Sequence, residues 1–106
     1  GLASPEQVLK ITRYLIGSLP GIEIGVHLHS TPDNWQKKIE AAYNADCFRY
    51  DGALKGIGGC PMANDDLVGN MNTEWMIDFF EKKNMIEGLN KAALEQSLEI
   101  ASEIFV

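Results

Sequence analysis

The chain has 106 residues, of which 45% are hydrophobic and 23% charged, a balance that fits one small folded domain. Its net charge of −6 argues against nucleic acid or an anionic membrane surface as the main partner, because both attract basic proteins. No apolar run approaches the ~18 residues that cross a bilayer, and no signal peptide begins the chain, so we expect no membrane attachment.

The first predicted element is a helix that extends from Pro5 to about Leu19. Ser4 and Gln7 have the spacing of a capping box, and Pro5 occupies the first helical position, where proline is favoured. The Leu-Pro-Gly sequence that starts at Leu19 ends the helix. The apolar face that we expect to be buried consists of Val8, Ile11, Leu15 and Leu19.

Two strands and a second helix follow. Residues 22–29 alternate between apolar and polar side chains, as in a strand with one face covered by helices. A cap and a proline at Thr31–Asp33 begin the second helix. Cys47–Asp51 is the second strand, in which Arg49 and Asp51 share a face and are expected to pair with each other or with neighbouring strands. The face of the second helix expected to be buried consists of Trp35, Ile39, Ala42 and Tyr43.

Residues 52–72 are rich in glycine, show no periodicity and are interpreted as a long loop, a kind of segment that is often functional. Asn72 or Thr73 then caps a third helix that extends to about Lys83, and a fourth helix begins at about Asn90. The residues expected to be buried are Met76, Phe79 and Phe80 in the third helix and Leu94, Leu98, Ala101 and Phe105 in the fourth.

This alternation of helices and strands is typical of α/β proteins with parallel strands. Two parallel strands are too few for a stable sheet, because such a sheet needs at least three strands and cover on both faces. We therefore expect the chain to be part of a larger sheet.

His27 and His29 are the first candidate functional residues. Side chains two apart on a strand lie on the same face, so both neutral imidazoles could reach one metal ion. The alternative is that both are polar residues at a strand end with their hydrogen bonds satisfied inside the fold. The spacing alone leaves both interpretations open.

Cys60 is the second candidate. The chain has only two cysteines, which is too few for a disulfide framework and fits a reducing compartment, so we expect a cytoplasmic protein. Gly58 and Gly59 before Cys60, with Pro61 after it, place the thiol on a bend with little bulk around it, as a catalytic thiol requires. The alternative is a small buried residue in a tight turn. Cys47, inside a predicted strand, is expected in the core.

Asn70 is the third candidate. An asparagine at this point would ordinarily cap a helix or stand in a turn, but its amide oxygen can also bind a hard cation. Two imidazoles with oxygen ligands favour Mg²⁺ or Mn²⁺ over a structural Zn²⁺, although zinc enzymes also use two histidines and an oxygen. Asp65 and Asp66, earlier in the same loop, are interpreted as solvated.

Four segments together resemble the hydroxymethylglutaryl-CoA lyase family: Gly25–His29, Gly56–Ala63, Gly69–Asn70 and Thr73–Glu74. The Gly-Gly-Cys-Pro run that begins at Gly58 is specific, because related Claisen-type synthases usually carry Glu-Arg where this chain has Cys60 and proline. The resemblance covers nearly the whole chain and corresponds to the C-terminal part of the family.

The resemblance implies a (β/α)8 TIM barrel, of which residues 1–106 would be a C-terminal fragment of a single catalytic domain. A complete barrel takes about 250 residues, so the fragment is expected to be incomplete and inactive without the N-terminal part. The resemblance also implies that His27, His29 and Asn70 are metal ligands, with Mg²⁺ or Mn²⁺ as cofactor. Cys60 would be the catalytic thiol, on a mobile loop that contains Gly58 and Gly59.

The implied reaction is cleavage of 3-hydroxy-3-methylglutaryl-CoA to acetyl-CoA and acetoacetate, with Lewis-acid polarisation by the metal and proton transfer by Cys60. The implied partners are the acyl-CoA substrate, the remainder of the barrel and a second copy in a homodimer. Two alternatives stay open. One is a Claisen-type synthase of the same superfamily, acting on an acyl-CoA and a 2-oxo acid. The other is a non-catalytic module whose two histidines and one thiol hold a structural metal ion.

Overall fold

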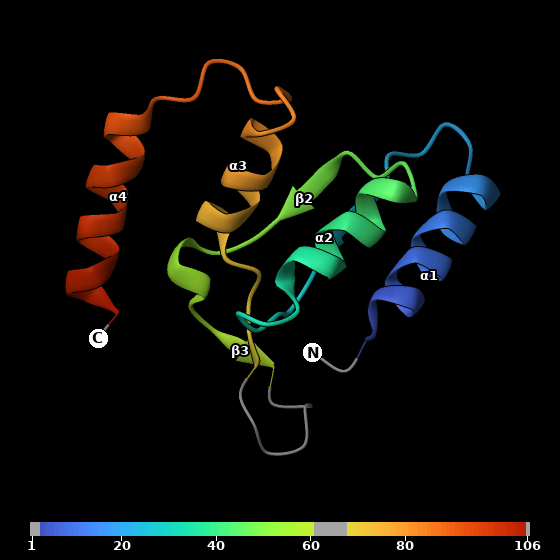
Figure 1. The fold of residues 1–106 in the computed structure, drawn as a ribbon, viewed down its shortest axis with the longest axis horizontal. Coiled ribbons are helices and arrows are strands. Elements are labelled where there is room, and N and C mark those ends of the chain that lie inside the picture. The colour runs from blue at the N-terminus through green and yellow to red at the C-terminus, as the bar shows by residue number, and fades with distance from the viewer. Residues whose placement is uncertain (1–2, 61–67, 106) are drawn as a thin grey trace.

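The computed structural model describes residues 3–60 and 68–105. Its four α-helices follow one another across the molecule in chain order, from α1 on the right of Figure 1 to α4 on the left. No helix in these two ranges is both long and apolar enough to cross a lipid bilayer. The helices are α1 (Pro5–Ser18), α2 (Trp35–Asn44), α3 (Thr73–Glu81) and α4 (Lys91–Ile104); the strands are β1 (Gly25–His27), β2 (Arg49–Asp51), β3 (Gly59–Cys60) and β4 (Val68–Gly69); and a 3-10 helix, η1, spans Leu54–Gly56.

Three of the helices begin at side-chain caps that local sequence predicts. The Ser4 hydroxyl accepts a hydrogen bond from the Gln7 N–H group and the Gln7 side chain accepts one from the Ser4 N–H group, which completes the capping box of α1. Each of the next two caps is an asparagine whose side chain accepts from backbone N–H groups of the first turn. Asn72 caps α3 and Asn90 caps α4. These caps satisfy N–H groups that have no partner inside a helix, so the predicted starts are confirmed.

The helix α2 begins later than predicted. The Asn34 side chain turns back to accept a hydrogen bond from the Thr31 N–H group at 2.8 Å, so Thr31 and the proline after it form a turn. The helix itself starts at Trp35. Its buried face is close to the predicted one, since Ile39 and Ala42 are fully buried.

The buried face of α1 differs from the predicted one. Only Val8 of the four expected residues is buried, and Thr12 takes the next inner position. Leu9 and Ile16 are partly buried beside them, whereas Ile11 is 58% exposed. The helix has apolar residues on more than one side, so its periodicity does not determine which side packs inside this chain.

The predicted parallel strand pair is confirmed. Gly25, Val26 and His27 of β1 lie opposite β2 in parallel register, with Val26 beside Tyr50. Both strands have only three residues and are shorter than predicted. Ile22, at the start of the expected first strand, lies outside β1 and is 60% exposed.

The two faces of this sheet differ. Val26 and Tyr50 are partly buried against the helices, while Gly25, His27 and Asp51 are exposed on the other face. Of the two partners expected for Arg49, Asp51 or a group of a neighbouring strand, the structure shows the second kind. Arg49 donates a hydrogen bond at 3.4 Å to the carboxylate of Glu23, just before the neighbouring strand, and both side chains are largely exposed.

The interpretation of residues 52–72 as a loop without structure is wrong in part. The 3-10 helix η1 comes first, and β3 and β4 then form a short antiparallel pair in which Gly59 lies opposite Gly69. A Cβ atom on Gly69 would lie 2.7 Å from the carbonyl oxygen of Gly56, so only glycine allows the two segments to approach this closely.

Helix α2 lies at the centre of the hydrophobic core and contributes to both of its clusters. Ala41 and Ala42 pack against Val8 of α1, and Ile39 packs against Met71 and α3. Trp35 of α2 also stacks on Trp75 of α3, with the ring centroids 5.4 Å apart. The core is therefore a junction of α1, α2, α3 and the parallel strand pair.

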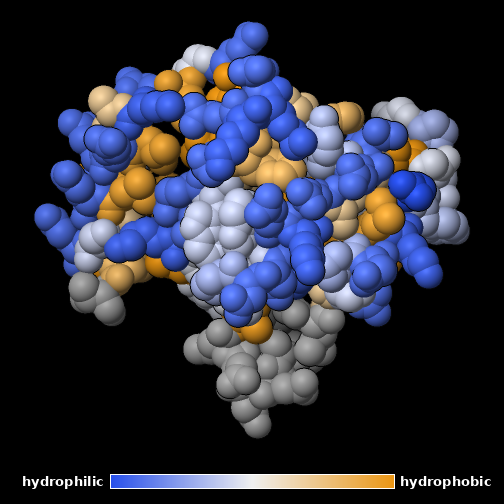
Figure 2. Space-filling view, in the orientation of Figure 1, coloured by the Kyte–Doolittle hydropathy of each residue, from blue (hydrophilic) through white to orange (hydrophobic). Residues whose placement is uncertain are grey.

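Helix α4 packs more loosely. Only Ala101 is buried; Phe105, expected to be buried, is 55% exposed, and Ile100 and Ile104 are also exposed. Figure 2 shows apolar side chains gathered over α4 at the left of the view. The helix is tied to η1 by a hydrogen bond of 2.6 Å from the Lys55 ammonium to the Ser102 hydroxyl.

Candidate metal and catalytic site

The end of β1 lies next to Asn70, which is 43 positions later in the chain than His27. His27 is the last residue of β1, and His29 forms an antiparallel β-bridge with Asn70. The structure therefore brings the three predicted metal ligands into one region. Two backbone hydrogen bonds flank the bridge, from Ser30 N–H to the Gly69 carbonyl (3.0 Å) and from Met71 N–H to the Leu28 carbonyl (2.8 Å).

The backbone of the glycine-rich turn orients the Asn70 amide. Nδ2 of Asn70 donates to the carbonyl of Ile57 at 2.8 Å, and Oδ1 at the other end of the amide accepts a hydrogen bond of 3.1 Å from Nε2 of the His27 ring. Gly58 has a φ of +86° and passes so close that a Cβ atom there would lie 2.7 Å from Nδ2. The turn therefore presents Asn70 through its oxygen, the atom that binds hard cations.

The ring of His29 has an unused nitrogen. Its Nδ1 atom is buried and has no hydrogen-bond partner among the described residues. Burial lowers the pKa of His29, and the nearby His27 lowers it further, so the ring is neutral in the form that binds metals. The two imidazole rings meet edge to face, with centroids 5.3 Å apart.

These three residues fit a divalent metal ion. Neutral imidazoles and an amide oxygen are donors that such an ion accepts, and Nε2 of His27 and Oδ1 of Asn70 already lie within hydrogen-bond distance of each other, at 3.1 Å. The orphaned Nδ1 atom of His29 is the kind of buried polar atom that a ligand would satisfy. In the described parts of the chain, no three His, Cys, Asp or Glu side chains form a metal-binding cluster. The donor set here is two imidazoles and an amide.

Cys60 is placed only through its backbone. Cys60 lies opposite Val68 in the pair of β3 and β4, directly after Gly58 and Gly59. Its side chain lies outside the described part of the structure, as do Pro61–Ala63, Asp65 and Asp66. The catalytic role of the thiol therefore stays a prediction. Cys47, in contrast, is buried as predicted, and burial raises the pKa of its thiol.

One residue near the site was not foreseen. Lys38 of α2 is only 3% exposed, and its ammonium donates a hydrogen bond of 2.7 Å to the carbonyl of His29. Burial lowers the pKa of Lys38. The only hint in the sequence is that Lys38 precedes Ile39, next to the apolar stripe of the helix, and lysine at such a position usually extends to solvent.

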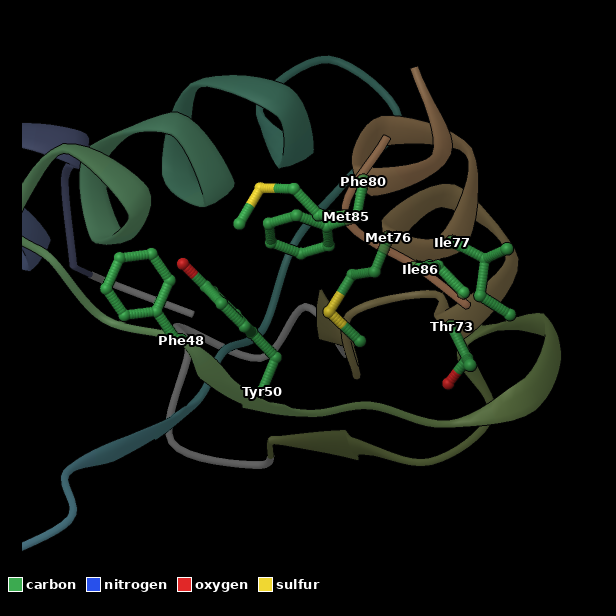
Figure 3. Close-up of a pocket in the computed structure, with 8 residues that line it drawn as sticks. All are labelled: Phe48, Tyr50, Thr73, Met76, Ile77, Phe80, Met85 and Ile86. Atoms are coloured by element: carbon green, nitrogen blue, oxygen red, sulfur yellow. The ribbon is translucent and has the colours of Figure 1, made fainter. Parts of the chain in front are cut away.

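An apolar hollow of the described surface lies away from these residues. This cavity, of about 410 Å³, lies between β2, α3 and the turn after α3 (Figure 3). None of the three predicted metal ligands lines it. The cavity has no cluster of charged or metal-binding groups, so we do not assign the chemistry to it. Its lining residues are Phe48, Tyr50, Thr73, Met76, Ile77, Phe80, Met85 and Ile86.

The sequence matches no family model. Among curated proteins, it is 33% identical over 94 residues to an (R)-citramalyl-CoA lyase from Chloroflexus aurantiacus and 29% identical over 85 residues to the hydroxymethylglutaryl-CoA lyase YngG from Bacillus subtilis. These matches cover 89% and 80% of the chain. They cover only 29% and 28% of the relatives, so the chain spans less than a third of the length of the curated proteins it matches.

Solved structures give the same result. An HMG-CoA lyase from Acinetobacter baumannii, solved in complex with coenzyme A and 3-methylmalate, matches 91% of the chain with a TM-score of 0.75 and 31% identity, over 31% of its own length. An HMG-CoA lyase from Brucella melitensis matches 98% of the chain with a TM-score of 0.81, over 36% of its own length; at 20% identity it supports the fold alone. The resemblance found in the motifs is confirmed: the chain is similar, in sequence and in fold, to the C-terminal part of the hydroxymethylglutaryl-CoA and citramalyl-CoA lyases.

Proposed function

We propose that the chain is the C-terminal part of a metal-dependent lyase that cleaves a carbon–carbon bond in a 3-hydroxyacyl-CoA. The proposed substrate is 3-hydroxy-3-methylglutaryl-CoA, which would yield acetoacetate and acetyl-CoA. The observation that carries the proposal is the meeting of Nε2 of His27 and Oδ1 of Asn70 at 3.1 Å. It occurs in a chain whose relatives include two CoA-thioester lyases.

His27, His29 and Asn70 would hold a divalent ion, Mg²⁺ or Mn²⁺. When bound, this ion would supply Lewis-acid polarisation of the substrate's hydroxyl and carboxylate oxygens. The protein would fix the ligands before the ion binds. The Ile57 carbonyl orients the Asn70 amide, and burial lowers the pKa of His29, which favours the neutral ring. Such preorganisation lowers the cost of binding.

Cys60 would transfer protons. In the proposed reaction the hydroxyl proton is removed, the carbon–carbon bond breaks, and its electron pair passes to the acetyl thioester, which then takes up a proton. Because Gly59 lies opposite Gly69, Cys60 and Asn70 lie near each other along the same hairpin. The hairpin thus links the proposed proton-transfer residue to a proposed ligand.

The rest of a TIM barrel would complete the sheet. In the described residues β1 pairs only with β2, and Gly25, His27 and Asp51 on one face are exposed. Parallel strands need both faces buried, which a closed barrel provides, and the active sites of barrels lie at the carboxyl ends of the strands, where His27 stands. The homodimer and the cytoplasmic location stay predictions.

A second candidate substrate is (R)-citramalyl-CoA, because the citramalyl-CoA lyase is 33% identical to the chain. The experiment that tests both is a cleavage assay of the protein with its complete barrel, run on each thioester with Mn²⁺ and again after removal of metal by EDTA. We expect cleavage of one thioester that is lost with EDTA and restored by Mn²⁺. Condensation of an acyl-CoA with a 2-oxo acid, without cleavage, would favour the Claisen-type synthase.

Metal analysis tests the remaining alternative. Tightly bound stoichiometric zinc with a bond to a cysteine sulfur would favour the non-catalytic module and contradict the lyase. Measurable cleavage by the 106-residue chain alone would show that the rest of the barrel is not needed.

A further inference from the structure

Lys38 is an unusual residue for the core of a small domain. It lies on α2 directly before the fully buried Ile39, and its own exposure is 3%. Lysine is almost never buried to this extent unless its charge is paired. Among the described residues no carboxylate lies within ion-pair distance of Lys38, and the hydrogen bond to the His29 carbonyl is its only recorded one.

The acceptor of this hydrogen bond is the backbone carbonyl of His29, one of the three proposed metal ligands. The β-bridge between His29 and Asn70 is flanked by backbone hydrogen bonds of Leu28 and Ser30, so the carbonyl of His29 itself takes no part in it. That carbonyl accepts from Lys38 at 2.7 Å. The backbone of His29 is therefore held from two sides, by the segment after β4 that contains Asn70 and by α2.

We propose that Lys38 is a positioning residue for the metal site, which fixes the backbone of His29 so that its ring stays in register with His27 and Asn70. The inference rests on the proposed metal site. Residues outside the ligand set that orient a ligand typically change metal affinity 10- to 100-fold when they are removed.

The direction in which metal affinity changes when Lys38 is replaced separates a positioning role from an effect of its charge. A buried ammonium near a divalent cation repels it, so loss of the charge alone would tighten metal binding. Loss of the hydrogen bond that holds the His29 carbonyl would weaken metal binding. Lys38→Met removes the cost of burying a charge but also leaves the His29 carbonyl without this donor, so the two effects on the free energy of unfolding oppose each other. A purely structural role for Lys38 would instead lower stability and metal affinity together.

The test compares Lys38→Met with Lys37→Met, which changes the exposed neighbour on the same helix. Mn²⁺ affinity is measured by electron paramagnetic resonance and stability by urea unfolding, both on the purified protein with its complete barrel. We expect Lys38→Met to bind Mn²⁺ at least ~10-fold more weakly with no loss of stability, and Lys37→Met to bind within ~2-fold of the unsubstituted protein. Equal or tighter binding by Lys38→Met overturns the inference, as does a loss of stability that accounts for the weaker binding.

A second pair keeps the test decisive if Lys38→Met does not fold. Lys38→Gln keeps most of the volume, but its N–H group is one bond closer to the backbone and falls short of the His29 carbonyl. We expect it to bind Mn²⁺ several-fold more weakly than Lys37→Gln; equal affinities would overturn the inference. If the unsubstituted protein binds no Mn²⁺, the proposed function fails together with the inference. If it binds Mn²⁺ and the Lys38 variants bind equally well, only the inference fails.

Discussion

Gly58 and Asn70 touch across the base of the β3–β4 hairpin, where a single added carbon on Gly58 would lie 2.7 Å from the Asn70 amide nitrogen. The backbone of Gly58 also has a φ of +86°, which side-chain-bearing residues rarely adopt. The orientation of a proposed ligand thus depends on the absence of a side chain twelve residues earlier.

Replacing Gly58 with alanine is therefore expected to damage both the fold and the site. We expect Gly58→Ala to lower the free energy of unfolding by about 1–3 kcal/mol, because of the positive φ and the contact with Asn70, and to weaken Mn²⁺ binding. Urea unfolding and Mn²⁺ titration measure the two effects. Gly17→Ala in α1, where nothing lies within 4 Å of the added carbon, is the control and should raise stability slightly. Unchanged metal affinity in Gly58→Ala would contradict the role given to the turn.

Cys60→Ser is expected to reduce the turnover of the complete enzyme severely while metal binding stays nearly unchanged. A hydroxyl is a much weaker acid than a thiol and transfers a proton poorly at neutral pH. Steady-state kinetics and Mn²⁺ titration give the two readouts. Cys47→Ala, which changes the buried cysteine, serves as the control and should retain turnover. Loss of metal in Cys60→Ser would instead make the thiol a ligand and favour the structural module.

Glu74 is expected to stabilise the start of the glycine-rich segment. Both of its carboxylate oxygens accept from the backbone N–H group of Lys55, at 3.0 and 3.1 Å, and Lys55 has a φ of +61°. Glu74 also lies in the first turn of α3, where a negative charge is favourable. We expect Glu74→Gln to lower the free energy of unfolding by about 1–2 kcal/mol. Glu99→Gln on the exposed side of α4 should change little in the same urea titration. Equal effects of the two variants would show that the contact with Lys55 contributes nothing.

Tyr50 gives a prediction about pH. Burial is the main reason that the pKa of Tyr50 is raised in the folded protein, so the folded state resists loss of the phenol proton. A raised pKa contributes stability that is present below the ordinary tyrosine pKa of about 10 and is lost as the pH rises above it. The unfolding free energy should therefore fall with pH above about 10.

Tyr50→Phe isolates this effect. At neutral pH it removes the 2.7 Å hydrogen bond from the phenol to the Cys47 carbonyl and should be less stable by about 1 kcal/mol. Since phenylalanine does not ionise, the difference from the unsubstituted protein should shrink as the pH rises above 10. Tyr14→Phe changes a tyrosine that is mostly exposed and should follow the unsubstituted protein at every pH. A constant difference between pH 7 and pH 11 would contradict the prediction.

Local signals were the part of the fold that could be predicted from the sequence. The caps at Ser4, Asn72 and Asn90 involve residues within three positions of one another, so their chemistry is visible in the sequence. The parallel pair of β1 and β2 followed from the alternation of elements. The hairpin of β3 and β4 could not be predicted, because its two-residue strands have no periodicity and glycine contacts hold them together.

Long-range partners were harder to predict. The sequence left open whether Arg49 would pair with Asp51 on its own strand or with a neighbouring strand, and its long side chain reaches Glu23 just before β1. The meeting of His27 with Asn70 was expected only through the resemblance to a family, since no spacing rule joins residues 43 apart. Lys38 was not foreseen because lysine is normally solvated, and only the fold shows that it is enclosed.

The stack of Trp35 on Trp75 joins the first turns of α2 and α3, and these are the two tryptophans of the chain. The tryptophan emission of the 106-residue chain therefore comes entirely from that junction. A change in this emission reports the separation or rearrangement of α2 and α3. Release of α1 or α4 would change the emission little. Tryptophan fluorescence of the 106-residue chain, followed as urea is added, is thus a local probe of the helices that flank His29 and Asn70.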